Sequence, residues 1–217
     1  LYCKYYIGDG EMYRFSEDLL KSGPIRDQRR AALDVLSAAL RAADPGEAVR
    51  RFLKLNGDML SVAGRSYDLR RFDRIMVVGG GKAGATMARA VEEVLGARVT
   101  AGVVNVKYGH LAPTAVVKIN EAGHPSLDDM KALTDSLLRC GATINEINTI
   151  RKHLSQVKGG GLARIASPST VLSLILSDVV GNPLDVIASG PTVPDTTTFQ
   201  HAWNVLQRYE LTDAIPE

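Results

Sequence analysis

The stretch Ile75-Met76-Val77-Val78-Gly79-Gly80-Gly81-Lys82-Ala83-Gly84 decides the fold class of this chain. It opens with a short, fully apolar run, which is typical of a strand buried in a parallel sheet. Three glycines follow directly, and helical periodicity then continues to about Leu95. A strand, a glycine-rich turn and a helix in this order predict the opening of an α/β fold.

Strand and helix patterns alternate on both sides of this stretch. Asp44-Pro45-Gly46-Glu47 predicts a helix start, because it offers an acidic N-cap and a proline at the first helical position. The alternation predicts a Rossmann-like, three-layer α/β domain with a mainly parallel sheet and the N-terminal helices packed alongside it. Further strands are predicted over 99–106, 116–119 and 171–176, and helices over 25–43, 128–147 and 199–209. The domain is expected to cover residues 25–217, after a tail or lead-in over residues 1–24.

Composition excludes several classes of protein. Hydrophobic residues make up 45% and charged residues 23% of the 217 residues, which rules out a disordered or collagen-like chain. The net charge of +2 argues against a nucleic-acid-binding surface. No apolar run reaches the roughly 18 residues that would indicate a membrane span, and no signal peptide is recognisable. Two cysteines, Cys3 and Cys140, do not form a disulfide framework, so a cytoplasmic protein with reduced thiols is predicted.

The glycine-rich turn also fits the pattern G-x-G-x-x-G. Its glycines let the backbone approach a phosphate, and the following helix presents free N–H groups and the positive end of its dipole. Lys82 adds a mobile positive charge at this point. The dinucleotide-binding version needs an acidic residue about 20 positions later, and none lies between Arg98 and Lys118, which argues against an NAD-dependent enzyme. The alternative interpretation is a tight turn with an exposed lysine.

A second polar cluster lies between residues 145 and 161. Arg151 and Lys158 could bind an anion there, with backbone donors from Gly159-Gly160-Gly161. The alternative is a solvated helix end followed by a flexible loop. Four polar residues recur at helical spacing and would form one polar face: Asn145, Asn148, Lys152 and Ser155.

A third cluster follows the predicted strand 171–176. Asp178 comes just after the carboxyl end of this strand, where ligands bind in open α/β sheets. A carboxylate there could hold Mg²⁺ or accept a hydroxyl proton, or it could simply cap the next turn. Ser189, Thr192 and Asp195 could line the same crevice or shape a long loop.

At these clusters the sequence resembles the two-domain glycerate 2-kinases, in which a Rossmann-like N-terminal domain precedes a C-terminal MOFRL domain. The resemblance runs from about Ile25 to Glu217. Together its motifs are highly specific. They are Val77 to Ala83, Gly123-His124-Pro125, Gly141 to Lys152, Leu154 to Ala163, Ser177 to Gly181 and Ile187 to Thr192.

The resemblance implies phosphoryl transfer from ATP to the 2-hydroxyl of D-glycerate, with ATP and Mg²⁺ as cofactors, no nucleic-acid or membrane partner, and a possible homodimer. Such transfer depends mostly on positioning and on neutralising charge. The motif match selects Lys82, Arg151 and Asp178 as catalytic residues. As a chemical assignment, Lys82 stabilises phosphate or the glycerate carboxylate, and Arg151 clamps anionic oxygens with Lys158. Asp178, alone or with Asp195, holds Mg²⁺ or takes the hydroxyl proton. Substrate or phosphate binding is assigned to Gly79, Gly80, Gly81, Asn148, Lys158, Ser189, Thr192 and Asp195.

Three departures from the family pattern weaken the kinase prediction for this chain. In the family, Gly-His-Pro is followed by a helix, a strand and a Ser-Gly-Gly-Gly-Ser loop, whereas here Ser126 runs directly into Leu127. The chain ends at Glu217, so the MOFRL-type domain is expected to be absent. Asn182 replaces the usual aspartate after Gly181. We therefore expect little or no activity from this chain, and the alternative is a non-catalytic remnant that binds a nucleotide or an organic anion.

Overall fold

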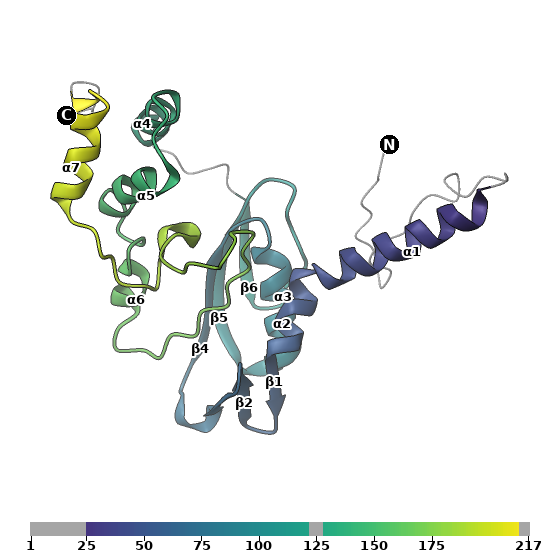
Figure 1. Cartoon of the computed structure of the whole chain (residues 1–217). Coiled ribbons are helices and arrows are strands. Elements are labelled where there is room, and N and C mark those ends of the chain that lie inside the picture. The colour runs from purple at the N-terminus through teal and green to yellow at the C-terminus, as the bar shows by residue number, and fades with distance from the viewer. Residues whose placement is uncertain (1–24, 122–127, 213–217) are drawn as a thin grey trace. The chain divides into compact units, whose positions relative to one another are not determined.

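The computed structural model describes residues 25–121 and 128–212. The chain divides into two compact units, residues 1–123 and 124–217, and each is described by itself. Figure 1 colours the first unit purple to teal and the second green to yellow.

Some predictions concern residues that the structure does not describe. The predicted tail over residues 1–24 and the Gly123-His124-Pro125 motif lie outside the described residues, as does the junction after Ser126. The single domain expected over residues 25–217 stays a prediction.

Two helices open the described part of the first unit. α1 (Arg26–Ala42) and α2 (Pro45–Phe52) lie where the sequence predicts helices. The side chain of Asp44 accepts a hydrogen bond from the backbone N–H of Glu47 at 2.7 Å, which confirms the predicted N-cap. α2 buries Val49, whereas α1 buries none of its side chains.

An antiparallel meander follows, which the sequence analysis did not predict. It consists of β1 (Leu53–Asn56), β2 (Met59–Val62) and β3 (Arg65–Asp68). Both of its turns use a glycine with positive φ, 56° at Gly57 and 83° at Gly64, where a side chain would be strained. The pair Asn-Gly at the first turn is a strong hairpin signal, so the sequence did carry the information.

The stretch that decides the fold class forms the edge of a parallel sheet. Its strands pair in the order β4 (Ile75–Gly80), β5 (Val99–Val106) and β6 (Val117–Glu121). The helix α3 (Gly84–Leu95) connects β4 to β5 and packs against β5. The predicted α/β class with a parallel sheet is confirmed.

α3 covers one face of this sheet (Figure 1). Val104 and Val106, on the covered face, are each 2% exposed, whereas Met76 and Val78, on the opposite face, are 63% and 60% exposed. Successive side chains of a strand point to opposite faces. Within the first unit β4 is therefore half-buried on the face toward α3 and exposed on the other, although its apolar run predicted burial on both.

In the second unit, the long helix predicted over 128–147 is wrong, because two helices occupy this region. α4 (Asp128–Arg139) ends before Gly141, whose φ of 81° breaks the helix, and α5 (Ile144–His153) starts anew. Thr143 and Glu146 form a capping box at this new start. The pattern Thr-x-x-Glu is a known signature of a helix start, so the break was visible in the sequence.

The hydrophobic core of the second unit lies between α4, α5 and α7 (Phe199–Arg208), the last of which is found where predicted. The carboxylate of Glu146 also accepts hydrogen bonds from Arg208 at 2.7 Å and from the Tyr209 hydroxyl at 3.0 Å. The start of α5 is thereby tied to the end of α7. The buried core residues are Leu133, Leu137, Ile147, Ile150, Ala202 and Leu206.

The strand predicted over 171–176 is wrong. The segment has no regular secondary structure, and its apolar side chains are largely exposed, from 40% at Val171 to 47% at Leu176. A strand needs a neighbour for its backbone groups, and the described part of the second unit contains no other strand. The remaining regular elements of this unit are α6 (Gly161–Ala166) and the short 3₁₀ helix η4 (Ile187–Ser189). No helix in the described ranges is long and apolar enough to cross a membrane.

Candidate functional site

The glycine turn of the first unit is shaped by backbone pairing. Gly79 and Gly80 belong to β4 and pair with β5. Gly81 leaves the strand with a φ of 115°, which favours glycine, and its N–H donates to the carbonyl of Asn105 at 2.9 Å. These glycines therefore allow an abrupt change from strand to helix.

Lys82 lies next to this turn, at the entrance of α3, and its side chain is exposed. Close packing follows at Gly84, where a Cβ would lie 2.7 Å from Cγ1 of Val104. This geometry fits the alternative interpretation of the sequence, a tight turn with an exposed lysine, and phosphate binding at the turn stays a prediction. A flexible ammonium at the positive end of a helix can reach an anion in solvent.

In the second unit, the turn Lys158–Gly161 is held against the loop 187–195 by backbone hydrogen bonds. The N–H of Gly159 donates to the Ser189 carbonyl at 3.0 Å, and that of Gly160 donates to the Gly190 carbonyl at 2.8 Å. Gly161 donates within the turn itself, to the carbonyl of Lys158. The expectation that these three amides serve a bound anion is therefore wrong, because each already has a partner.

Two cations remain beside this turn. The ammonium of Lys158 donates to the Ala188 carbonyl at 3.1 Å. Burial lowers the pKa of Lys158, and the nearby charge of Arg151 lowers it further. Among the described residues, neither cation forms an ion pair with a carboxylate. Two neighbouring positive charges without such a partner favour an anion at this place.

Asn148 and Ser189 brace the loop from inside. The Ser189 hydroxyl donates to Oδ1 of Asn148 at 3.0 Å, and Nδ2 of Asn148 is 3.4 Å from the Val186 carbonyl. Both side chains are buried, at 6% and 2% exposed. The predicted polar face of α5 exists at Asn148 and Lys152, but the loop covers it. The polar groups of Asn148 and Lys152 are therefore engaged in contacts that hold α5 and the loop together.

Asp195 is enclosed in the same way. Its Oδ1 accepts from the N–H of Thr197 at 2.9 Å and from the Thr197 hydroxyl at 2.8 Å, and Lys152 Nζ lies 3.4 Å away. Burial opposes ionisation, but these hydrogen bonds and the lysine charge outweigh it, so the pKa of Asp195 lies below its usual value. Sequence reasoning missed the contribution of Thr197. The Asx-type contact from Asp195 to the residue two positions later was its only signal.

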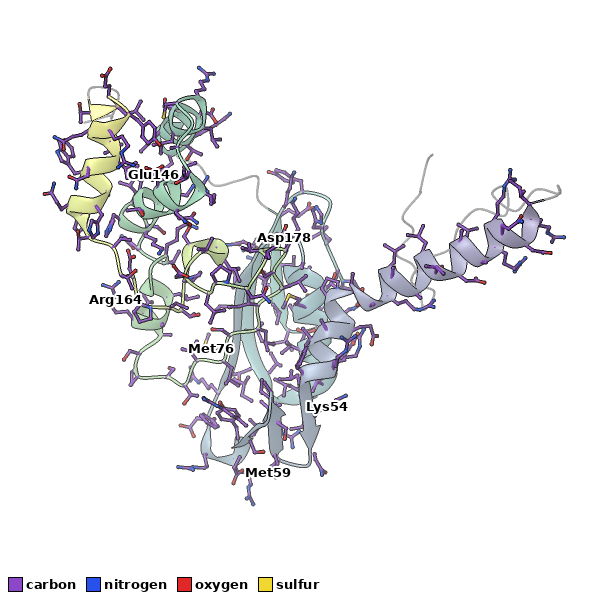
Figure 2. All side chains as sticks on the ribbon, viewed as in Figure 1. Lys54, Met59, Met76, Glu146, Arg164 and Asp178 are labelled. Carbon is purple, nitrogen blue, oxygen red and sulfur yellow. The ribbon has the colours of Figure 1, made fainter. Side chains whose placement is uncertain are left out.

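Asp178 lies beyond the irregular segment and is exposed (Figure 2). The turn after it is capped by Ser177, whose hydroxyl accepts from the N–H of Val179 at 3.0 Å. The capping role considered for Asp178 is thus filled by its neighbour, and its carboxylate faces solvent. Thr192 behaves differently, since its hydroxyl accepts from the hydroxyl of Ser173 at 3.0 Å.

The donor set can be compared with what Mg²⁺ requires. In the described ranges, no group of three or more histidine, cysteine, aspartate or glutamate residues could hold a metal ion. Kinases, however, usually bind Mg²⁺ through one or two carboxylates together with the phosphates of the nucleotide. An exposed carboxylate such as Asp178 fits this mode, whereas the enclosed carboxylate of Asp195 does not.

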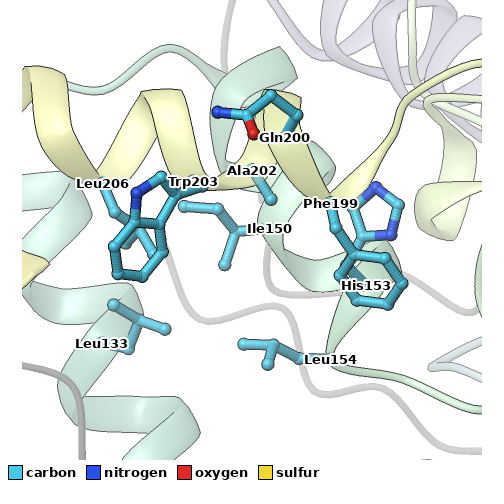
Figure 3. Close-up of a pocket in the computed structure, with 9 residues that line it drawn as sticks. All are labelled: Leu133, Ile150, His153, Leu154, Phe199, Gln200, Ala202, Trp203 and Leu206. Carbon is cyan, nitrogen blue, oxygen red and sulfur yellow. The ribbon is translucent and has the colours of Figure 1, made fainter.

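A separate hollow of about 340 Å³ lies between α4, α5 and α7 of the second unit. Its walls are mostly apolar, and the described residues that line it include no aspartate, glutamate, lysine or arginine (Figure 3). Such a surface does not suit phosphate chemistry. The lining residues are Leu133, Ile150, His153, Leu154, Phe199, Gln200, Ala202, Trp203 and Leu206.

The predicted site residues are thus distributed over both units. The first unit carries Lys82 with Gly79, Gly80 and Gly81. In the second unit, the turn at Lys158 and the loop 187–195 come together, with Arg151 near Lys158 and Asn148 bonded to Ser189. Residues that the sequence analysis gave no role in a site, but that shape this region, are His153, Ala188 and Thr197.

A family model described as a domain of unknown function (DUF4147) matches this chain in two segments, residues 31–129 and 126–217. The segments meet at residues 126–129, next to the junction where the sequence departs from the glycerate kinase pattern.

Among known proteins, the glycerate 2-kinase of Pyrococcus horikoshii is 36% identical over 236 aligned positions, which cover 88% of this chain and 52% of the relative. The aligned stretch is longer than the 217 residues of the chain, so the relative has residues where this chain has none. The chain spans about half the length of the curated relatives it matches.

Two solved structures are similar to this chain. A crystal structure of a Pyrococcus horikoshii protein has a TM-score of 0.78 and 36% identity, covering 88% of this chain and 53% of its own. The glycerate kinase of Thermotoga maritima has a TM-score of 0.70 and 34% identity, covering 85% of this chain and 52% of its own.

Proposed function

This chain belongs to the family described as a domain of unknown function, DUF4147, and we propose that its full-length parent is a glycerate 2-kinase. The parent would transfer a phosphoryl group from ATP to the 2-hydroxyl of D-glycerate. The relatives named glycerate kinase support the reaction class. The observation that carries the proposal is the pair of cations Arg151 and Lys158, held beside a braced turn without a described carboxylate partner.

These two cations would bind anionic oxygens of the nucleotide or of glycerate. Arg151 can bind two oxygens with its planar guanidinium, whereas Lys158 acts as a point charge. The partial burial of Lys158 strengthens its attraction for an anion, because fewer waters compete. Both effects act on phosphate groups, whose charge must be neutralised during transfer.

Lys82 would supply charge from the glycine turn of the first unit. Its exposed side chain leaves the ammonium free to move toward a phosphate or a carboxylate. The glycine turn keeps the helix start close to the sheet edge, so the lysine begins from a fixed backbone position. We propose a role in neutralising the transferred phosphate or the glycerate carboxylate.

Asp178 would hold Mg²⁺ together with the phosphates of ATP, or would accept the proton of the attacking hydroxyl. When bound, Mg²⁺ neutralises charge that develops on the phosphate oxygens. Asp178 is suited to either role because it is exposed and because Ser177, not Asp178, caps the neighbouring turn. We also propose that the parent uses ATP and Mg²⁺, lies in the cytoplasm and forms a homodimer.

We expect this chain to be impaired relative to its parent. The alignments place residues of the relatives where this chain has none, and the segment 171–176 lacks a strand partner in the described part of its unit. A second candidate function is therefore a non-catalytic remnant that still binds a nucleotide or an organic anion. The exposed apolar side chains of 171–176 favour it, because an apolar segment without a strand neighbour adds nothing to the packed core.

Kinetics of the full-length parent with D-glycerate and MgATP test the proposed roles. Asp178→Asn and Lys82→Met should each lower kcat by about 100-fold or more, since they remove charge needed in the transition state. Lys131→Met, an exposed lysine on α4, is the matched control and should leave kcat unchanged. Equal activity of all variants would contradict the assignment. For the chain itself, MgATP that raises Tm without turnover would support the remnant.

A further inference from the structure

We propose that Asp195 is a positioning residue that fixes the turn at Gly159, and through it the ammonium of Lys158, rather than a ligand of Mg²⁺ or substrate. The inference rests on the proposed anion site and assigns Asp195 a role within it. Asp178 and Asp195, which the sequence suggested as joint ligands, would then have different roles, because of the two only Asp178 is an exposed carboxylate.

The carboxylate of Asp195 is already engaged by protein partners. Thr197 donates two hydrogen bonds to Oδ1, and Lys152 Nζ lies 3.4 Å from the same oxygen. Oδ2 lies 3.7 Å from Nε2 of His153. The side chains of Lys152, His153 and Asp195 are 6%, 13% and 15% exposed. A metal ion or a substrate would have to displace this set of protein partners.

The glycine turn packs directly against Asp195. Gly159 has a φ of 55°, and a Cβ placed there would lie 3.1 Å from Cβ of Asp195. A Cβ on Gly160 would lie 3.0 Å from the Val193 carbonyl oxygen. The segment 193–195 therefore packs against the turn so closely that side chains at Gly159 and Gly160 would collide with it.

The glycine turn is joined directly to the cation Lys158. Lys158 immediately precedes Gly159, and its ammonium is held by the carbonyl of Ala188. Ala188 and Ser189 both have positive φ, 52° and 60°, which L-residues rarely adopt. Strained backbone of this kind persists only where its surroundings enforce it. Here the packing of Asp195 against the turn, and the hydrogen bonds between the turn and the loop, hold this backbone in place.

The direction in which Asp195→Asn changes anion affinity distinguishes a positioning role from a purely electrostatic one. Asp195→Asn removes a negative charge near the proposed anion site and leaves Lys152 without its partner. By Coulomb's law alone, the loss of a negative charge must strengthen the binding of an anion. A fall in anion affinity can therefore come only from a loss of positioning.

The experiment titrates tripolyphosphate into the chain at low salt and, in parallel, follows hydrogen exchange of the Gly159 and Gly160 amides. We expect Asp195→Asn to weaken tripolyphosphate binding about tenfold, as removal of a supporting group behind a ligand commonly does, and to speed exchange of both amides. Thr197→Val keeps the charge and removes one hydrogen bond, so it should shift both readouts in the same direction if Asp195→Asn does not fold.

The matched control is Glu146→Gln, which removes an equally engaged carboxylate from the other end of α5. It should leave affinity and glycine exchange unchanged, at a temperature where all variants are folded. Unchanged or tighter binding by Asp195→Asn, with both amides still protected, would overturn the proposal. If the wild-type chain binds no tripolyphosphate, the proposed anion site fails, and the exchange data alone decide whether Asp195 fixes the turn.

Discussion

The hydroxyl of Ser189 donates a hydrogen bond to Oδ1 of Asn148 at 3.0 Å, across 41 residues of sequence and with both side chains buried. This contact joins α5 to the loop that braces the Lys158 turn. A buried polar group without a partner is costly, so each of these two residues requires the other.

Ser189→Ala should therefore destabilise the chain, because it leaves the amide oxygen of Asn148 buried without a donor. We expect a loss of about 1–3 kcal/mol in the free energy of unfolding, measured by urea denaturation. Ser173→Ala is the matched control, since this serine also donates to a side chain but is exposed. Its effect should stay within about 0.5 kcal/mol. Equal effects of the two substitutions would contradict the contact.

Lys158→Met should raise Tm while abolishing anion binding. Burial lowers the pKa of Lys158, so at neutral pH the charged lysine is less favourable in the folded chain than in the unfolded chain. This penalty applies below the lowered pKa and disappears as pH rises to the ordinary lysine value of about 10.4. The gain in Tm should therefore shrink at high pH. Lys131→Met, on an exposed position, should change neither Tm nor tripolyphosphate binding.

Glu146 should make the stability of the second unit sensitive to acid. Hydrogen bonds from the backbone and hydroxyl of Thr143 lower the pKa of Glu146 to about 2, with further bonds from Tyr209 and Arg208. A depressed carboxylate pKa stabilises the fold above the unfolded value of about 4.3, and this stabilisation is lost as pH falls toward 2.

Urea denaturation between pH 6 and pH 2, a range of about four units around that transition, tests this link. Wild type should lose stability in this range more steeply than Glu146→Gln, which has no carboxylate to protonate. Glu210→Gln, on an exposed side chain, serves as the control and should follow the wild-type curve. Parallel curves for wild type and Glu146→Gln would show that the capping box does not carry the effect.

Gly102→Ala should destabilise the parallel sheet. A Cβ at Gly102 would lie 2.6 Å from the Val77 carbonyl oxygen and 2.8 Å from Cγ2 of Val117, so neighbouring strands would have to move. We expect a cost of about 1–3 kcal/mol, the usual range for overpacking. Gly79→Ala is the matched control, because its nearest contact would be an ordinary 3.5 Å. A thermal unfolding series that ranks the two alike would contradict the register of β4 and β5.

Local patterns predicted the parts of the fold that depend on neighbouring residues. The strand, glycine turn and helix around Lys82 follow from apolar periodicity and from the freedom of glycine, and the structure confirms them. The break after Arg139 was missed although the Thr143 capping box signals it, because apolar spacing continues across Gly141. The segment 171–176 was misassigned, because an apolar run does not say whether a partner strand is present.

The arrangement of the candidate site was harder to predict. The residue types around Lys158 indicated an anion site, but no local rule says that Gly159 and Gly160 donate to the loop 187–195. Likewise, Asp178 and Asp195 look equivalent as carboxylates in a polar stretch. Only tertiary contacts show that one is exposed and that the other is enclosed by Lys152 and Thr197.

The identity of the reaction product tests the kinase assignment most directly. The full-length parent is incubated with D-glycerate and MgATP, and the phosphorylated position is read by phosphorus NMR. The account predicts 2-phosphoglycerate from the parent and little or no product from this chain alone. Product phosphorylated only at the 3-hydroxyl, or turnover only with a different hydroxy acid, would contradict it.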